Sequence, residues 1–275
     1  MAHTINKEGT LYEVSQGQVS VDGTLHPVSV GYANVNGELK EIGFASYDPV
    51  FANNTWEQII EACQTNRVPD TWAVGDSKIV DETATYQHSL VIIGKNHDQY
   101  ADGSGYAPLT FQFKDAYRSS DSITDDTLDG SETYAYHWVG TDLYTRFNTK
   151  ANNNYWPMPT LLRDAVKQVL KPCSTVYSGW GTELKPTYLF PLSEAEIVSS
   201  GYRSDWTEGT QYEYYSDNLE ATRVKYRVGS TTKVEWWTRT SRTNTGPSYI
   251  TIRTTGRTSS QDPDSKYYLC PGLCF

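Results

Sequence analysis

The stretch VEWWT at residues 234–238, with YITIR at residues 249–253 and YYLCPGLCF at residues 267–275, decides the fold class. Each run is short and rich in β-branched and aromatic residues, which favour strands. Turn-forming Thr, Ser, Asn, Gly and Pro separate the runs. Further strand-like runs lie at residues 88–93, 109–113, 187–190 and 224–228. The sequence therefore predicts an α+β fold with a mainly antiparallel sheet.

Two to three short helices are expected among these strands. A Thr-x-x-Gln capping box at residues 55–58 opens the first, and apolar residues repeat at helical spacing from there to about residue 66. The second is predicted over residues 160–170, because Pro172 then ends the pattern. A Ser-x-x-Glu capping box at residues 193–196 opens a third, shorter helix.

The N-terminal residues 1–47 follow a separate pattern. GQVSVDGTLHPVSV at residues 17–30 aligns with GYANVNGELKEIGF at residues 31–44, so the period is 14 residues. Asp-Gly and Asn-Gly at matching places suit two-residue hairpin turns. Isolated hairpins are marginally stable, so these predict either an assembly module that orders against partner subunits or a β extension packed on its own domain. We assign the remaining domain to residues 51–275.

Composition and charge exclude several classes of protein. The formal net charge is −10, which argues against a nucleic-acid partner. The 8 Trp, 21 Tyr and 7 Phe supply material for a core, so disorder is not expected. No stretch is long and apolar enough for a membrane span, and residues 1–10 lack the features of a signal peptide. We expect a protein made in a cytoplasm, with no membrane partner.

Cysteines and acidic loops give no clear metal site. The four cysteines lack zinc-ligand spacing and are too few for a disulfide framework, so we expect reduced, small apolar fillers. DSITDDTLDGSE at residues 121–132 and NHDQYADG at residues 96–103 lack the 1, 3, 5 spacing of a calcium loop, and we interpret both as solvated loops. We predict no cofactor, with a structural calcium ion as the alternative.

No catalytic motif stands out. None of the five histidines lies in an H-E-x-x-H arrangement, and neither a G-x-S-x-G elbow nor a phosphate loop is present. Paired carboxylates depend on their separation in space, so Asp98, Asp102 and Glu196 are candidates only as acidic residues, and Glu196 already belongs to a capping box. We predict that the protein is not an enzyme.

Positive charge concentrates at residues 221–260, which hold eight basic residues and one acidic residue, Glu235. This segment has a net charge of +7, so the rest carries −17. Aromatic residues are interleaved with the basic ones: Tyr226, Trp236, Trp237 and Tyr249. Two interpretations remain open. A basic, aromatic sheet face suits anionic polymers such as wall phosphates or acidic sugars; alternatively, these residues pair with the acidic remainder or with a neighbouring chain.

A series of motifs supports a resemblance to a known family. The motifs are WEQII at 56–60, WAVGDSK at 72–78, IIGKNHDQYADGSG at 92–105, LFPLSEAE at 189–196, EGTQYEYY at 208–215 and WWTRTS at 236–241. In this order they resemble a domain family of unknown function that is common in Gram-positive gut bacteria and their phages, often in phage structural and tail proteins. The family's Trp-Leu-Arg-Ser-Pro signature is only partly kept at residues 237–241.

The resemblance implies a C-type-lectin-like fold and assigns roles to residues. The signature residues would be structural, their rings filling the core and the arginine tying loops together: Trp56, Trp236, Trp237 and Arg239. The candidates for ligand or receptor contact are loop aromatics and bases that no core pattern demands: Tyr202, Arg203, Trp206, Arg242, Tyr249, Arg253 and Arg257.

The resemblance also implies a function. We expect a phage virion structural protein, in a tail fibre, baseplate or head fibre, that attaches to a glycan or wall polymer on the Gram-positive host cell. Its partners would be other virion proteins, bound through the N-terminal repeats, and further copies of itself, with a trimer favoured. The alternative is a purely architectural capsid decoration or tail adaptor. An oxidising enzyme of the lectin-like superfamily would need a reactive cysteine pair, and Cys270 and Cys274 are the nearest candidates.

Overall fold

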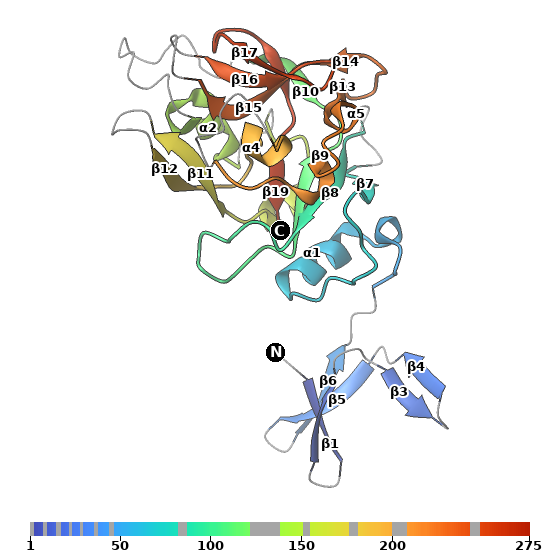
Figure 1. Ribbon diagram of the computed structural model, residues 1–275. Coiled ribbons are helices and arrows are strands. Elements are labelled where there is room, and N and C mark those ends of the chain that lie inside the picture. Colours follow the sequence, from blue (N-terminus) through green and yellow to red (C-terminus); the bar gives the residue numbers. More distant parts are fainter. Residues whose placement is uncertain are drawn as a thin grey trace. The chain divides into compact units, whose positions relative to one another are not determined.

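The computed structural model divides into two compact units, Met1–Pro49 and Val50–Phe275 (Figure 1). It describes residues 3–7, 10–14, 18–21, 24–27, 30–35, 38–43, 47–81, 87–121, 138–150, 155–175, 181–199, 208–242 and 248–275. No helix in these ranges is long and apolar enough to cross a bilayer.

The described residues of the N-terminal unit form three antiparallel pairs of strands. The pairs are β1 (His3–Lys7) with β2 (Thr10–Val14), β3 (Gln18–Val21) with β4 (Thr24–Pro27), and β5 (Val30–Val35) with β6 (Glu38–Gly43). The registers place Val21 opposite Thr24 and Val35 opposite Glu38. The Asp-Gly and Asn-Gly dipeptides predicted to form the turns lie outside the described residues.

Two larger sheets build the C-terminal unit. The first, in the order β19-β9-β8-β7, is antiparallel and contains β7 (Ser77–Ile79), β8 (Ser89–Lys95), β9 (Leu109–Phe113) and β19 (Gly272–Cys274). The second has the order β10-β18-β15-β16-β17, with β10 (Tyr117–Asp121), β15 (Trp236–Ser241), β16 (Tyr249–Ile252), β17 (Thr258–Gln261) and β18 (Tyr267–Leu269). In it, only β15 and β18 pair in parallel.

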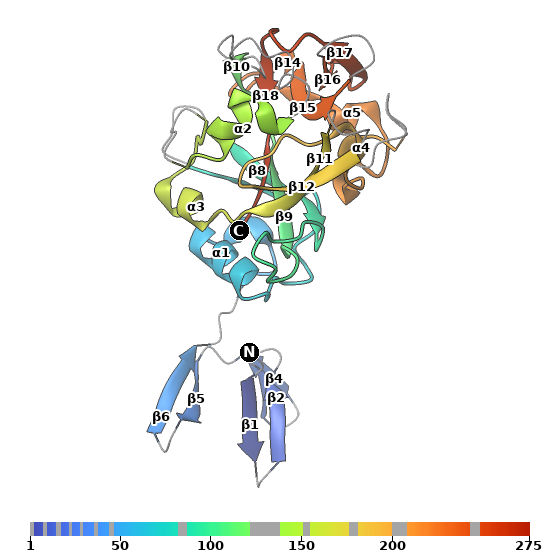
Figure 2. The same cartoon turned by 90° about the vertical axis from the view of Figure 1, so that its left-hand side faces the viewer.

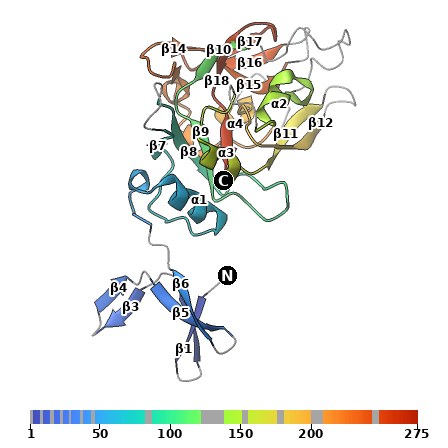
Figure 3. The same cartoon turned by 180° about the vertical axis from the view of Figure 1, so that it is seen from behind.

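Two hairpins, five short α-helices and three 3₁₀ helices complete the described part of this unit, which Figures 2 and 3 show from two further sides. The 3₁₀ helices are Phe51–Asn53, Trp138–Gly140 and Glu213–Tyr215. The hairpins are β11 (Val169–Thr175) with β12 (Gly181–Thr187), and β13 (Lys225–Tyr226) with β14 (Lys233–Val234). The α-helices are α1 (Trp56–Gln64), α2 (Asp142–Phe147), α3 (Thr160–Ala165), α4 (Glu194–Ile197) and α5 (Glu220–Arg223). The predicted class, α+β with mainly antiparallel sheets and few helices, is confirmed.

The predicted helix starts are confirmed, but one helix is shorter than expected. Both capping boxes form, at Thr55 with Gln58 and at Ser193 with Glu196. The prediction of a helix over residues 160–170 is wrong, because α3 ends at Ala165 and β11 begins at Val169. The helix ends because Val166 has the non-helical backbone angles φ −58° and ψ 127°. The next residue, Lys167, then donates its N–H to the Cys274 carbonyl at 2.9 Å instead of to the helix.

Three of the predicted strands also need correction. In the range 187–190 only Thr187 is in a strand, and in the range 224–228 only residues 225–226 are. The range 267–275 is not one strand, since the chain crosses from β18 to β19, in different sheets, through Cys270 and Pro271. Proline has no N–H to donate to a ladder, and its carbonyl here accepts the Phe113 N–H at 3.1 Å.

An aromatic cluster forms the core beneath α1. Phe51 lies edge-on to Trp72 with ring centroids 5.3 Å apart, and Phe111 lies 5.3 Å from Phe275. Trp56 packs against Phe111 at 6.2 Å, and its indole N–H donates to the Ile79 carbonyl. Edge-to-face pairs of this kind add stability beyond the area they bury.

All four cysteines are buried free thiols, as predicted: Cys63, Cys173, Cys270 and Cys274. Burial raises the pKa of Cys63 and of Cys173 to about 12 and that of Cys270 to about 11. A thiol with so high a pKa stays protonated at neutral pH, and the thiolate is the reactive form. The side chains therefore behave as small apolar groups.

His88 makes the stability of this core depend on pH. Its ring lies edge-to-face with Phe113 and Tyr117, at 5.6 and 5.5 Å, and burial lowers its pKa from 6.5 to about 4. Below pH 6.5 the unfolded chain binds a proton that the folded protein accepts only near pH 4. We therefore expect the free energy of unfolding to fall by about 1–2 kcal/mol over this range, after allowing for the partial exposure of the ring.

Urea titrations at several pH values between 7 and 4 test this expectation. The variant His88→Phe keeps the ring packing but has no group to protonate, so it should lose this part of the pH dependence. An equal pH dependence in the variant and the wild type would show that another group is responsible.

Candidate functional site

The structure places the predicted contact residues in different environments. Tyr202, Arg203 and Trp206 lie outside the described residues. Tyr249 was expected in a surface loop, and this is wrong, because it lies in β16 and is fully buried. Its ring packs edge-on against Trp237, with ring centroids 6.4 Å apart.

Of the two interpretations of the basic segment, a sheet face with interleaved aromatic rings does not fit β15, and pairing with acidic residues of the same chain holds for Arg239 and Arg257. Trp236 and Trp237 are fully buried, and their neighbour Arg239 is 0% exposed. Arg223 and Lys225 are buried as well. Every residue of β15 is buried, so this strand has no solvent-facing side. The structural role predicted for Trp236, Trp237 and Arg239 agrees with this burial.

The basic side chains that remain exposed lie on two neighbouring loops. Arg227 and Lys233 lie on the hairpin of β13 and β14, next to Tyr226, which is 38% exposed. Arg253 and Arg257 lie on the turn between β16 and β17. We call these five residues the basic rim. Arg242 is part-exposed, at the end of β15.

Backbone contacts connect the two loops of the basic rim. The hairpin ends at Val234, which pairs with Lys225. Two residues later the chain enters β15, where Trp236 pairs with Ile252. Arg253 follows Ile252 directly and begins the turn. The turn between β16 and β17 packs on α5, where the Arg257 Nε donates to Glu220 at 2.8 Å. Both partners of this pair are largely exposed, so it leaves most of the positive charge accessible to solvent.

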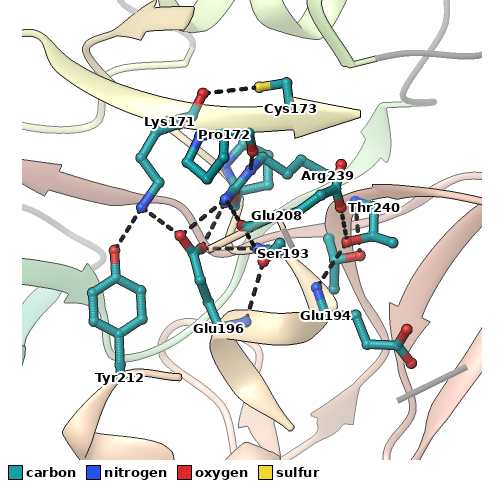
Figure 4. Close-up of polar contacts among 12 residues, drawn as sticks. Lys171, Pro172, Cys173, Ser193, Glu194, Glu196, Glu208, Tyr212, Arg239 and Thr240 are labelled. Atoms are coloured by element: carbon teal, nitrogen blue, oxygen red, sulfur yellow. Dashed lines mark hydrogen bonds and ion pairs between the residues drawn. The ribbon is translucent and has the colours of Figure 1, made fainter. Parts of the chain in front are cut away.

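A buried ionic network between β11, α4 and β15 is centred on Arg239 (Figure 4). The guanidinium donates to both carboxylate oxygens of Glu196, at 2.6 and 2.9 Å. It also donates to the backbone carbonyls of Pro191 and Glu208, at 2.9 and 2.6 Å. Lys171 reaches the same carboxylate at 2.5 Å. One carboxylate thus joins β11, α4 and β15.

Lys171 extends the network to a second carboxylate. Its ammonium lies 2.6 Å from Asp98, and it donates to the Tyr212 hydroxyl at 2.9 Å. The Tyr212 hydroxyl in turn donates to Asp98 at 2.8 Å. The expectation that residues 96–103 form a solvated loop is therefore wrong for Asp98, which is 3% exposed and ion-paired.

Two glutamates of the network, Glu196 and Glu208, have opposite pKa shifts. Burial alone would raise the pKa of Glu196, but the charges of Arg239 and Lys171 outweigh it and lower the pKa to about 2. Burial raises the pKa of Glu208, even though its carboxylate accepts from the Ser174 N–H at 2.8 Å and from the Thr240 hydroxyl at 2.5 Å. Glu196 is therefore the fixed negative charge at the centre of the network.

This network holds the fold together. Its charged side chains are each at most 3% exposed, so no substrate reaches them: Asp98, Lys171, Glu196, Glu208 and Arg239. From the sequence, Glu196 was predicted as a capping residue and a weak acidic candidate, Glu208 stood only as the first residue of a family motif, and Lys171 was not predicted. The contact of Glu196 with Arg239 spans 43 residues, and the capping box, which involves Ser193 and Glu196 alone, gives no signal of it.

The described residues hold a shallow groove and no metal cluster. The groove, of about 330 Å³, lies where the start of α1 meets α3, and its lining includes Trp56, Lys78 and Leu161. Lys78 is already engaged, since its ammonium donates to the Ala52 carbonyl at 2.9 Å. No group of three or more His, Cys, Asp or Glu residues in the described ranges is arranged to hold a metal ion. Most of the acidic stretch at residues 121–132 lies outside those ranges.

Comparison with known proteins gives one match. Residues 124–275 match the model of a family that is described as a domain of unknown function (DUF6273). The matched range contains β15, the network arginine and the basic rim. No curated protein and no solved structure matches the chain.

Proposed function

The chain belongs to this family of domains of unknown function, whose model covers more than half of its residues, and from this premise we propose a function based on its exposed charge. We propose that the protein is a phage virion structural protein that attaches to an anionic wall polymer or glycan on the surface of a Gram-positive host cell. The basic rim is the contact surface in this proposal.

One observation carries the proposal: a group of exposed cations in a protein with a net charge of −10. Arg227, Lys233 and Arg253 form no ion pair within the described residues. Arginine forks and flexible lysines suit phosphate and carboxylate groups, and an exposed tyrosine ring offers a stacking surface for a sugar. Each single contact of this kind is weak, so attachment would depend on many copies acting together.

The assembly that supplies those copies is part of the same proposal. We assign the hairpin repeats of the N-terminal unit to assembly with other virion proteins, and we expect a homo-oligomer, with a trimer favoured. The C-terminal unit would be C-type-lectin-like, and its buried tryptophans and Arg239 agree with the structural role that such a fold gives to its signature residues. The protein would act in the virion, after assembly in the host cytoplasm.

Charge reversal in the basic rim tests the attachment. We expect full-length protein to bind intact Gram-positive cells, or purified anionic wall polymer, and to release as salt is raised. The double variant Arg227→Glu/Arg253→Glu should bind at least about tenfold more weakly. Arg67→Glu/Lys95→Glu, which lies on a different surface next to α1 and changes the net charge by the same −4, is the matched control and should bind as the wild type does.

Two outcomes would contradict the attachment. If the double variant binds cells as well as the wild type, the basic rim is not the contact surface. If the wild type binds no cell or polymer at any salt concentration but purifies with particle subunits, the protein is an architectural component, and its basic rim meets an acidic neighbour.

A further inference from the structure

Strand β12 has an edge with no partner strand among the described residues. It pairs with β11 alone, from Thr187 opposite Val169 to Gly181 opposite Thr175. The ribbon views show it at the border of the C-terminal unit (Figures 1 and 3). A free edge presents unpaired N–H and C=O groups, onto which another strand can add.

Contacts of β11 show which backbone groups of β12 face that edge. The Ser174 N–H donates to Glu208 at 2.8 Å, and the Pro172 carbonyl accepts from the Arg239 Nε at 3.3 Å. These β11 residues direct their backbone groups away from β12, so the residues opposite them on β12 direct theirs toward the free edge. Those residues are Thr182, Leu184 and Pro186.

The free edge is apolar at its centre and charged on either side of it. Leu184 is 57% exposed and can therefore contact a strand added at this edge. Glu183 and Lys185 flank it and lie 2.6 Å apart along the strand. Their side chains are 53% and 34% exposed, so both can reach a partner beyond the edge.

The segment TELKP at residues 182–186 is complementary to itself. An antiparallel pair centred on Leu184 places this leucine opposite Leu184 of a second copy. Glu183 then lies opposite Lys185 of that copy, and Lys185 opposite its Glu183. Opposite charges across an antiparallel pair are stabilising, and a parallel pair or a shifted register would lose this match.

We propose that the β12 edge joins two copies of this chain about a twofold axis at Leu184. The two Leu184 residues exchange a pair of backbone hydrogen bonds, their side chains bury each other, and two ion pairs flank them. Pairing stops at Pro186, which has no N–H and whose carbonyl already accepts from the Tyr144 hydroxyl at 3.0 Å. The contact is therefore short and reversible.

This inference goes beyond the proposed function. The proposed function assigns the N-terminal unit to assembly with other virion proteins and expects a homo-oligomer without naming its contact, whereas this twofold contact joins C-terminal units. Together the two associations would link assemblies and increase the number of basic rims presented at once.

A cysteine at the centre of the edge tests the geometry. Leu184→Cys adds an exposed thiol to a chain whose own four cysteines are buried. Facing residues of a hydrogen-bonded pair have Cα atoms about 5.5 Å apart, which suits a disulfide. Under mild oxidation of the full-length protein we expect reducible dimers from this variant, and far fewer from Leu219→Cys, where the native side chain is 59% exposed on another surface. Equal dimer yields from the two variants would overturn the proposal.

A charge swap tests the register independently. Glu183→Lys and Lys185→Glu each place like charges opposite each other, so each should weaken twofold association of the full-length protein by about tenfold in sedimentation experiments. The double variant Glu183→Lys/Lys185→Glu restores opposite charges and should associate as the wild type does. A double variant as weak as the single ones, with an unchanged unfolding temperature, would overturn the proposal.

Discussion

Replacing Arg239 with methionine is expected to lower the free energy of unfolding by about 3–5 kcal/mol, because it leaves a charge buried without its partner. Glu196 loses two hydrogen bonds from the guanidinium and keeps Lys171 and the Ser193 N–H as its partners. The carbonyls of Pro191 and Glu208 lose a donor as well. A buried acceptor without a donor adds its own desolvation penalty. Urea denaturation followed by tryptophan fluorescence measures the change.

Two further variants separate the buried pair from a general loss of charge. Arg257→Met removes an arginine whose side chain is 72% exposed and should change the free energy of unfolding by about 0.5 kcal/mol or less. Arg239→Met/Glu196→Gln removes both charges of the buried pair. It should therefore cost less than the sum of the two single variants. A loss below about 1 kcal/mol for Arg239→Met would contradict the role given to the network.

Replacing Gly256 with alanine is expected to cost about 2–4 kcal/mol, from backbone strain together with a steric clash. The backbone φ of Gly256 is +84°, a region that favours glycine. A Cβ at this position would lie 1.9 Å from the carbonyl oxygen of Glu220, so the turn between β16 and β17 would have to move off α5. Denaturant titration measures the loss.

Gly103→Ala is the matched control for this variant. Gly103 also has a positive φ, of +76°, but its Cβ would meet nothing within 4 Å. It should therefore show the backbone cost alone, about 1 kcal/mol. If the two alanine variants lower the free energy of unfolding equally, the contact between the turn and α5 does not contribute to the stability of the protein. The same displacement would move Arg253 and Arg257, so Gly256→Ala should also weaken any polymer binding by the basic rim.

Patterns formed by residues close together in the sequence predicted the starts of the helices correctly. The capping boxes at Thr55 and Ser193 each lie within four consecutive residues, so their hydrogen bonds can be inferred without knowledge of the fold. The end of α3 could not be inferred in this way. It depends on Lys167 pairing with Cys274, and residues 160–170 alone give no sign of that partner.

The burial of the charged residues could be predicted from the sequence even less well than the end of α3. A count of charge treats Arg239 and Arg253 alike, although one is fully buried and the other exposed. The difference arises because β15 is covered on both sides, and such a strand does not alternate between apolar and polar residues. The burial of Tyr249 has the same origin, since its strand pairs with β15 and is also buried throughout.

The pairing of β9 with β19 sets the order in which this chain can fold during synthesis. Gln112 and Cys270 bond to each other across 158 positions, so β9 is made long before its neighbour. A ribosome adds about 5–20 residues per second, which delays completion of this sheet by roughly ten seconds or more. The N-terminal strands pair only with their neighbours in sequence, and such local contacts form fast. The strand pairs of the N-terminal unit can therefore form before the C-terminal unit is folded.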